Sequence, residues 1–541
     1  MSDAHPWWKG AILYHVYVRS FFDADGDGQG DLAGVMARLD YIASLGVDGI
    51  WLSPIHPSPN RDWGYDVADY DGVHPDYGTM ADFEALLAAA HGLGLKVLLD
   101  EVLSHTSDEH PWFVESLTGG PDGPKADWYV WADPAPDGTA PNNWLSVFGG
   151  PAWAYQPARR QHYHHKFLRQ QPKLNWLNPD AREAAISVLD AWLTRGVDGF
   201  RLDVAGTFLH DAALADNPAI PASERTARHW KHAGDMQRHL HDSNLAENIP
   251  LLAEVRRRVE AHGDRFVFGE FSEEEAICGG YCTPTEGLHS GYTFVMLLED
   301  RLSPAFVKDH YATLAAYPGH WPTICFSNHD VPRTASRLGD GSPEAARLML
   351  ALLIALKGTT LIYQGEELGL PQASLRRDQL RDPVGDLYWP YAGGRDGCRT
   401  PMPWTPDAPN LGFSEGEPWL PAAPEHAGLT VAEQQADPDS TLALARRLIA
   451  FRKASPALTV GDIGMLEATP AILAFVRRAE DDAVACVFNM SADPAVFEHP
   501  ALAGAELLAV GAGEAEIRGG SLGLSPYGAA FFQMPLLTTP G

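Results

Sequence analysis

Two apolar segments of this chain each end in a carboxylate, and this feature constrains the fold more than any other. Residues 199–204 read Gly-Phe-Arg-Leu-Asp-Val and residues 266–271 read Phe-Val-Phe-Gly-Glu-Phe, which places Asp203 and Glu270 near their ends. A third apolar run leads into Ser-Asn-His-Asp and ends at Asp330. A charge at the end of a buried strand is costly unless it is paired or functional. Three such charges predict a barrel that presents carboxylates to a substrate at one face.

Apolar runs that are too continuous for strict alternation predict buried parallel strands covered by helices. These runs lie at 12–18, 47–53, 96–102, 199–204, 265–271, 292–296, 323–327 and 360–363. Helical patterns lie between most of them, at 33–45, 80–93, 181–194 and 343–356. Alternating strand and helix units predict an α/β fold, and eight of them fit a (β/α)8 TIM barrel better than an open sheet.

Two irregular segments, and a change from helical to strand-like sequence patterns near the C-terminus, divide the chain further. The segment 105–175 is rich in Pro, Gly, Trp, Tyr and His, and is typical of a subdomain inserted after the third strand, over the C-terminal face of the barrel. A second irregular insert, at about 371–425, follows the eighth strand, and long loops of this kind are usually binding loops. Beyond a helix near 440–453, three strand-like runs predict a C-terminal antiparallel β domain. The predicted domains are the first part of the barrel at 1–104, the insert at 105–175, the second part of the barrel at 176–456 and the β domain at 457–541.

Composition narrows the range of partners. Asp and Glu total 71 against 40 Lys and Arg, which gives a formal net charge of −31. Such a surface repels nucleic acids and anionic membranes, so we expect neither as a partner. The longest apolar stretch, 348–356, is far shorter than the roughly 20 residues of a membrane helix, and no signal peptide is visible. We therefore expect a cytoplasmic protein. The five cysteines imply no disulfide framework, and Cys278 and Cys282 lack the second pair that a zinc site needs.

The neighbours of the two carboxylates predict different chemical roles. Asp203 lies two residues after Arg201, on the same face of a strand, and a nearby Arg lowers the pKa of a carboxyl group and fixes its orientation. Glu270 lies between Phe268 and Phe271, and an apolar setting raises the pKa of a carboxyl group, as a general acid requires. Two carboxyls held close together can cleave a glycosidic bond. The alternative is that Asp203 and Arg201 form a structural ion pair and that Glu270 lies on the surface. This alternative does not explain the third carboxylate, Asp330.

Five short segments resemble the signature regions of the alpha-amylase family, glycoside hydrolase family 13. They read Asp-Glu-Val-Leu-Ser-His at 100–105, Gln-Pro-Lys-Leu-Asn at 171–175, Gly-Phe-Arg-Leu-Asp at 199–203, Phe-Gly-Glu at 268–270 and Phe-Ser-Asn-His-Asp at 326–330. Each segment is short, but their order and spacing taken together are specific for this family. The resemblance covers essentially the whole chain. It implies a (β/α)8 barrel with an inserted B domain and a C-terminal β-sandwich, in agreement with the layout above.

The resemblance also implies a retaining mechanism. Asp203 corresponds to the nucleophile, Glu270 to the acid/base and Asp330 to the transition-state stabiliser. Non-catalytic relatives of this fold usually lack carboxylates of this triad and carry a membrane helix, so a transporter subunit is disfavoured. The further side chains expected to contact the sugar are Arg201, His105 and His329.

Two further segments resemble one particular branch of the family. The segment Asp-Trp-Gly-Tyr-Asp that begins at Asp62 resembles the segment closing the sugar pocket of exo-acting alpha-glucosidases. By this resemblance Asp62 binds the outer hydroxyls of glucose and Tyr65 stacks on its face. Arg399, in Gly-Cys-Arg-Thr-Pro-Met-Pro-Trp, resembles the arginine that pairs with this aspartate. Phe148 and Phe167 match aromatic pocket walls, with packing in the core as the alternative.

The residue after the nucleophile bears on linkage. It tends to be Val in relatives that act on alpha-1,6 bonds or isomerise sucrose and Thr in relatives that act on alpha-1,4 bonds, and here it is Val204. However, the following Ala-Gly-Thr is not the usual oligo-1,6-glucosidase form, and Lys173 stands where that group has Asp, so linkage stays open.

The expected function is that of an exo-acting retaining alpha-glucosidase that releases glucose from short alpha-glucosides such as maltose, isomaltose or sucrose, with transglucosylation. The alternatives are an oligo-1,6-glucosidase and a sucrose isomerase or glucosyltransferase of the same family. We expect a monomer or dimer and no organic cofactor.

A loop after the first strand predicts a structural cation. It packs four carboxylates into nine residues, and hard oxygen ligands suit Ca²⁺ or Mg²⁺. The matching loop of alpha-glucosidases uses Asp side chains and one backbone carbonyl, here that of Gln29. A polar turn without an ion is the alternative. Ser104 replaces the Asn that binds a different calcium in amylases, so that second ion is not expected. The candidate ligands are Asp23, Asp25, Asp27, Gln29 and Asp31.

Overall fold

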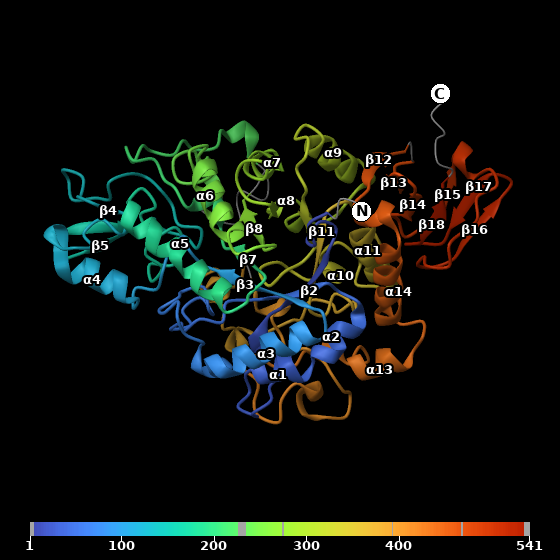
Figure 1. Cartoon of the computed structure of the whole chain (residues 1–541), viewed down its shortest axis with the longest axis horizontal. Helices are drawn as coiled ribbons and strands as arrows, with labels where there is room; N and C mark the ends of the chain where they lie inside the picture. The colour runs from blue at the N-terminus through green and yellow to red at the C-terminus, as the bar shows by residue number, and fades with distance from the viewer. Residues whose placement is uncertain (1–4, 226–233, 273–274, 392, 467–468, 535–541) are drawn as a thin grey trace.

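The computed structural model describes residues 5–225, 234–272, 275–391, 393–466 and 469–534, and its centre is a sheet of eight parallel strands (Figure 1). The strand order is β10-β11-β1-β2-β3-β7-β8-β9. The two outer strands meet, because Ser290 Oγ of β9 lies 2.7 Å from Thr323 Oγ1 of β10. This contact closes the sheet into the predicted barrel. The strands are β1 (Ile12–Val16), β2 (Gly49–Leu52), β3 (Lys96–Glu101), β7 (Gly199–Leu202), β8 (Phe266–Phe271), β9 (Ser290–Thr293), β10 (Thr323–Ile324) and β11 (Thr359–Tyr363).

All eight predicted strands are confirmed, with ends that differ by a few residues. The end predicted for the sixth strand was wrong. We expected a strand over 292–296, but β9 ends at Thr293 and a short helix, α8 (Phe294–Leu297), begins there. The Thr293 hydroxyl accepts a hydrogen bond from the Val295 amide, and such a cap starts a helix even in a run apolar enough for a strand.

Helices cover the barrel and begin where the sequence supplies caps. Thr79 and Asp82 form a capping box at the start of α3 (Met80–Gly92). Asn178 caps α5 (Pro179–Thr194), and α11 (Pro343–Ala355) is buried along most of its length. The other covering helices are α1 (Leu32–Ala37), α2 (Leu39–Leu45), α6 (Asn248–Glu260), α7 (Glu275–Tyr281), α9 (Pro304–Leu314), α10 (Thr334–Arg337), α13 (Val431–Ala436), α14 (Thr441–Ala454) and α15 (Pro456–Thr459). Within the described residues, no helix is long and apolar enough to cross a bilayer. The five cysteines are free and buried.

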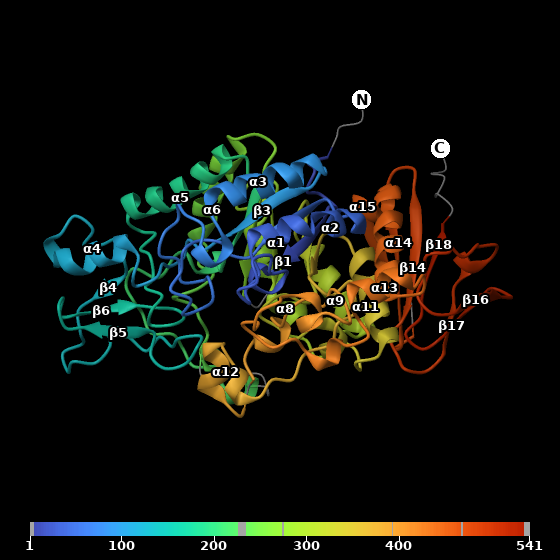
Figure 2. The same ribbon diagram turned by 90° about the horizontal axis from the view of Figure 1, so that it is seen from below.

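Two further groups of strands lie at opposite ends of the long axis of the molecule (Figures 1 and 2). Between β3 and α5, the chain forms α4 and a small antiparallel sheet in the order β4-β6-β5. At the other end, two antiparallel sheets in the orders β12-β13-β14-β18 and β15-β17-β16 share an apolar core. The domain boundaries stated above stay predictions. The bounds are α4 (Pro111–Gly119), β4 (Trp131–Ala132), β5 (Trp153–Gln156), β6 (Gln161–His164), β12 (Asp462–Met465), β13 (Ile472–Arg478), β14 (Ala483–Asn489), β15 (Ala495–Glu498), β16 (Ala515–Arg518), β17 (Ser521–Leu524) and β18 (Ala529–Gln533).

Candidate active site

The carboxyl ends of the barrel strands open into a cavity of about 1010 Å³. A cavity of this size is as large as sites that enclose drug-sized ligands. Ten of the residues predicted for the site line it, whereas Arg201 and Arg399 are fully buried behind its wall. The ten are Asp62, Tyr65, His105, Phe148, Phe167, Asp203, Val204, Glu270, His329 and Asp330.

Three carboxylates converge on the buried guanidinium of Arg201. Its Nη1 lies 2.7 Å from Asp100 Oδ1 and 2.8 Å from Asp203 Oδ1. Its Nη2 lies 2.7 Å from Glu270 Oε1. Asp100 lies on β3, Asp203 directly follows β7 and Glu270 lies on β8. These are neighbouring parallel strands, whose carboxyl ends lie together. One cation therefore holds both predicted catalytic carboxyls side by side.

The shared cation changes the acid–base behaviour that we predicted. Burial raises the pKa of Asp203 and of Glu270, and Arg201 opposes the rise in both. Nearby carboxylates add to the rise, chiefly Glu270 and Asp100 at Asp203, and Asp330 at Glu270. The expectation that Arg201 holds the pKa of Asp203 low was wrong, because burial, together with the neighbouring carboxylates, raises this pKa more than Arg201 lowers it. Burial also raises the pKa of Asp100 to about 7, so the cluster retains a proton more readily than isolated carboxylates do.

Glu270 is oriented by two hydrogen bonds. Its Oε1 accepts one from the Tyr292 hydroxyl at 3.0 Å, and its Oε2 accepts one from the Val204 amide at 3.1 Å. Val204 has φ 40° and ψ 46°, a left-handed conformation that a β-branched residue rarely adopts. This backbone turns the Val204 amide toward the acid, while the residue also lines the cavity. Tyr292 was not predicted as a site residue, because the strand predicted over 292–296 placed it at the wrong end, whereas β9 ends at Thr293.

Asp330 is held in its charged form by two arginines. Its Oδ1 lies 3.0 Å from Arg399 Nη2 and 3.2 Å from Arg395 Nη1. Burial raises the pKa of Asp330, but these arginines lower it below the usual range of an aspartate. The side chain remains 20% exposed. Asp330 thus presents a fixed negative charge to the cavity, as stabilisation of a positively charged transition state requires.

Asp62 forms an ion pair in the part of the cavity wall beside Asp330, but its arginine is not the one that we predicted. Asp62 Oδ1 lies 2.5 Å from Arg395 Nη2, and Asp382 holds the same guanidinium at 2.8 Å. Arg399, the predicted partner, instead reaches Asp330 and the backbone carbonyl of His329. The two arginines flank one short turn of the insert, so residue type alone could not show which of them faces Asp62. The density of charge in this insert was the only signal for Arg395.

Aromatic and histidine side chains form the remaining wall in this part of the cavity. The Tyr65 ring stacks on His329, with centroids 5.1 Å apart, and the Tyr65 hydroxyl donates to Asp100. Burial lowers the pKa of His105 to about 3 and that of His329 well below its usual value, so both rings are neutral. Within the described residues, neither ring nitrogen of His329 has a hydrogen-bond partner. Phe167 packs against both His105 and Phe148, with centroids 5.4 and 5.7 Å apart.

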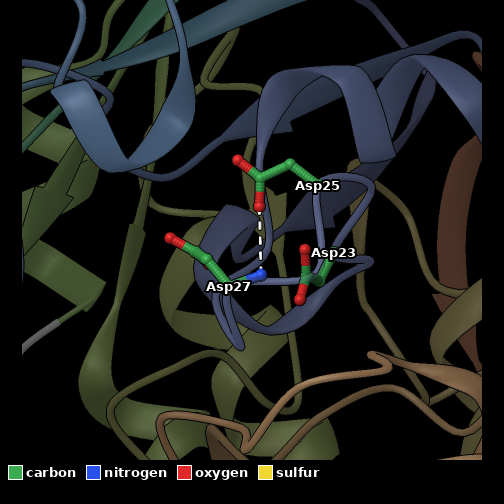
Figure 3. Close-up of side chains that lie close together, drawn as sticks. All are labelled: Asp23, Asp25 and Asp27. Carbon is green, nitrogen blue, oxygen red and sulfur yellow. Dashed lines mark hydrogen bonds between the residues drawn. The ribbon is translucent and has the colours of Figure 1, made fainter.

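The acidic loop after β1 brings three of its carboxylates together (Figure 3). One oxygen from each of Asp23, Asp25 and Asp27 lies within 4.8 Å of the others. Burial and the charges of Asp25 and Asp23 raise the pKa of Asp27, although its hydrogen bond to an amide opposes the rise. Asp31 lies outside this group of three and caps α1 by accepting a hydrogen bond from the Gly34 amide. Convergent carboxylate oxygens fit the preference of a hard cation.

Comparison with known proteins gives two family matches. Residues 15–461 match a family described as "Alpha amylase, catalytic domain", and residues 465–531 match "Maltogenic Amylase, C-terminal domain". The chain is 47% identical over 509 residues to a probable alpha-glucosidase of Rhizobium meliloti (strain 1021), with 92% of each chain covered. It is 34% identical over 532 residues to an oligo-1,6-glucosidase of Parageobacillus thermoglucosidasius, with 91% of this chain and 92% of the relative covered.

Solved structures give the same picture. The crystal structure of the alpha-glucosyl transfer enzyme XgtA is similar with a TM-score of 0.95 and 45% identity, over 98% of this chain and 100% of XgtA. The trehalulose synthase MutB from Pseudomonas mesoacidophila MX-45 is similar with a TM-score of 0.88 and 31% identity, over 98% of this chain and 100% of MutB.

Proposed function

This chain belongs to the alpha-amylase family of glycoside hydrolases, and from this membership we propose that it is an exo-acting retaining alpha-glucosidase. The observation that carries the proposal is the pair of carboxyls that Arg201 holds, Asp203 and Glu270. They lie in a cavity whose wall includes the ion pair of Asp62 and Arg395, and we infer that this pair closes one end of the cavity. The enzyme releases glucose from the non-reducing end of short alpha-glucosides.

The positions of the carboxyls assign the steps of the reaction. Glu270 gives its proton to the leaving glycosidic oxygen while a carboxylate oxygen of Asp203 attacks the anomeric carbon and forms a covalent glucosyl-enzyme. Burial raises the pKa of Glu270 and keeps that proton available. Protonation of Glu270 removes a charge that raises the pKa of Asp203, so Asp203 ionises beside Arg201. Asp330 stabilises the positive charge that develops on the sugar ring. Water, or the hydroxyl of another sugar, then gives a proton to Glu270 and displaces Asp203.

The closed end of the cavity supports exo-action. Asp62 and Arg395 form an ion pair whose side chains are only 5% and 13% exposed, and Gln171 Nε2 donates to the second oxygen of Asp62 at 3.0 Å. A polysaccharide cannot pass through a wall that is closed in this way, so only a terminal glucosyl unit can reach Asp203. His329, whose Nδ1 forms no hydrogen bond among the described residues and whose Nε2 lies 3.3 Å from Asp330 Oδ2, is available to bind hydroxyls of that unit.

Names of relatives support the substrate class. Several relatives are named oligo-1,6-glucosidases, XgtA is described as an alpha-glucosyl transfer enzyme, and a MutB variant has been solved with the substrate sucrose. For this chain we propose maltose, isomaltose or sucrose as substrates, with transfer of glucose to sugars beside hydrolysis. An oligo-1,6-glucosidase and a sucrose isomerase or glucosyltransferase are the alternatives, and Val204 favours both.

We also propose a structural Ca²⁺ or Mg²⁺ in the loop after β1. Asp23, Asp25 and Asp27 would hold it, with Gln29 and Asp31 as the further ligands that the family resemblance implies. The convergence of three carboxylates supports this proposal, because several oxygen ligands in one place suit a hard cation.

A time course of products tests the proposed function. We expect para-nitrophenyl alpha-glucoside to be cleaved and long starch to be left intact, and rapid depolymerisation of starch would contradict the exo-acting pocket. The same time course on maltose, isomaltose, nigerose, trehalose and sucrose identifies the preferred linkage. Oligosaccharide products would measure the proportion of transfer to hydrolysis.

A further inference from the structure

A buried lysine belongs to the wall of the cavity but has no part in the mechanism above. Lys166 and Phe167 are neighbours in the chain and both line the cavity. The Phe167 ring packs against His105 and Phe148. The Lys166 ammonium instead reaches the long connection between β7 and α6. Its side chain is only 5% exposed.

Two residues of that connection hold the ammonium. Lys166 Nζ donates to Asp242 Oδ2 at 2.7 Å and lies 3.1 Å from His239 Nδ1. The Asp242 side chain is fully buried, and its Oδ1 accepts a hydrogen bond from Asn217 Nδ2 at 3.0 Å. Although burial raises the pKa of Asp242, Lys166 and His239 hold it well below its usual range. Lys166 and Asp242 are therefore a charged pair within the protein.

The same connection leads from this pair to the catalytic carboxyls. Two residues after Asp242, the Asn244 amide donates to the carbonyl of Gly206 at 2.7 Å, and Gly206 lies three residues after Asp203. The Asn244 side chain donates to Ser272 Oγ at 3.3 Å, just beyond Glu270 in the chain. Asn244 and Ser272 also line the cavity. The segment that holds Lys166 therefore continues into the part of the cavity wall beside the catalytic carboxyls.

The chemistry of the pair indicates what it binds. An ammonium has three N–H donors, of which Asp242 takes one and His239 at most a second. Among the described residues, no further hydrogen bond from Nζ is formed, so one donor is left for a ligand in the cavity. Because the charges of Lys166 and Asp242 cancel, the pair suits a neutral ligand rich in hydroxyls better than an anion. A buried ion pair is also costly compared with apolar packing, which argues against a purely structural role.

We propose that Lys166, positioned by Asp242, determines specificity for the sugar that occupies the acceptor side of the cavity. Its ammonium donates a hydrogen bond to a hydroxyl of the sugar that leaves during glucosyl transfer to the enzyme, or that attacks the glucosyl-enzyme afterwards. This inference rests on the proposed alpha-glucosidase function.

Two donors separate this role from a structural one. Alpha-glucosyl fluoride has no leaving sugar, whereas maltose and sucrose place a second sugar next to Lys166. In Lys166→Met, we expect the ratio of kcat/KM for the better disaccharide to kcat/KM for the fluoride to fall about tenfold or more. Lys166→Arg keeps the charge and is expected to restore part of that ratio. Lys308→Met, at an exposed site on α9, is the matched control and should leave the ratio unchanged.

A second variant covers the case in which Lys166→Met does not fold. Asp242→Asn keeps a hydrogen-bond acceptor but removes the charge that holds the ammonium, and we expect the ratio to fall in the same direction. An equal loss with both donors in either soluble variant, or no loss at all, would overturn the inference. If the unmodified enzyme cleaves neither the fluoride nor a disaccharide, the proposed function itself fails, so the two failures are distinguishable.

Discussion

Arg201 is the residue on which the acid–base chemistry depends. We predicted it as a contact for Asp203 and the sugar, but it also binds Asp100 and Glu270 and is fully enclosed. Its planar guanidinium spreads its N–H donors over two terminal nitrogens in a fixed geometry, whereas a lysine ammonium carries its three donors on one nitrogen. Because three carboxyls share one positive charge, the pKa of the first protonation is a property of the whole cluster rather than of one side chain.

The nucleophile is tested by Asp203→Asn. The amide keeps the size of the side chain and a contact to Arg201, but it cannot attack the anomeric carbon. We expect turnover to fall by about 10³-fold or more, as for other groups that act only in the transition state. Circular dichroism and the melting temperature should show a folded protein. Activity within tenfold of the unmodified enzyme would refute the assignment.

The pH dependence of the enzyme reports on Tyr292. Its hydroxyl donates to Glu270 Oε1 and so stabilises the ionised carboxylate, which lowers the pKa of Glu270. Tyr292→Phe removes this hydrogen bond, raises that pKa further and keeps the acid protonated to higher pH. The alkaline limb of kcat/KM is therefore expected to move upward by about half a unit to one unit. A shift of the alkaline limb to lower pH would show that this limb does not report the pKa of Glu270.

At the scale of elements, the loop between β11 and α13 supplies what closes the cavity. A double-mutant cycle with Asp62→Ala and Arg395→Ala tests this closure. Asp62→Ala opens the wall although Arg395 keeps its contact with Asp382, and Arg395→Ala leaves the buried Asp62 without its cation. In each single variant, kcat/KM for maltose or the preferred disaccharide should therefore fall by about 10- to 100-fold. The double variant should lose much less than the product of the two single effects, because the pair acts as one unit. Independent, multiplicative effects would show that the ion pair is not what forms the wall.

The sequence predicted the strands and the carboxylates of the site well, because both are local signals. An apolar run such as 199–204 marks a strand, and its terminal Asp203 marks the catalytic face. Contacts that join distant segments could not be predicted in the same way. Arg395 meets Asp62 across 333 positions, and Lys166 meets Asp242 across 76. Which residues become partners depends on how the long loops fold, and neither the periodicity of the sequence nor the residue types indicate that.

The acidic loop between β1 and α1 is tested by removing its proposed cation. Treatment with EDTA should lower the melting temperature by a few °C, because an ion that binds only the folded state stabilises it by mass action. Calcium or magnesium should restore the original value. Asp25→Asn removes one ligand of the group and should reduce the difference between the chelated and the reloaded protein. Equal melting temperatures with and without EDTA in the unmodified protein would contradict the proposed ion.

At the scale of the whole molecule, two buried arginines bind the end of α11, and one of them, Arg477, joins the barrel to the C-terminal sheets. Arg452 of α14 donates to the carbonyls of Ile354 and Leu356, at the end of α11. Arg477 of β13 donates to the carbonyl of Ala355 at 2.8 Å and to that of Gly461 at 2.9 Å. The last carbonyls of a helix lack partners within it, and positive charge is favourable there. The join therefore lies before the start of β11, on the face of the barrel opposite the cavity.

Arg477→Met tests whether this join stabilises the fold independently of catalysis. Methionine keeps the apolar stem but leaves two buried carbonyls without their donor, which is only partly offset by removal of a buried charge. We expect the free energy of unfolding to fall by about 2 kcal/mol, measured by urea denaturation. The kcat/KM for the preferred disaccharide should not change, because the contact lies at the opposite ends of the strands. Arg478→Met, at the partly exposed neighbouring position, is the matched control and should alter neither quantity. A loss of kcat/KM in Arg477→Met at full stability would mean that the C-terminal sheets influence the cavity directly.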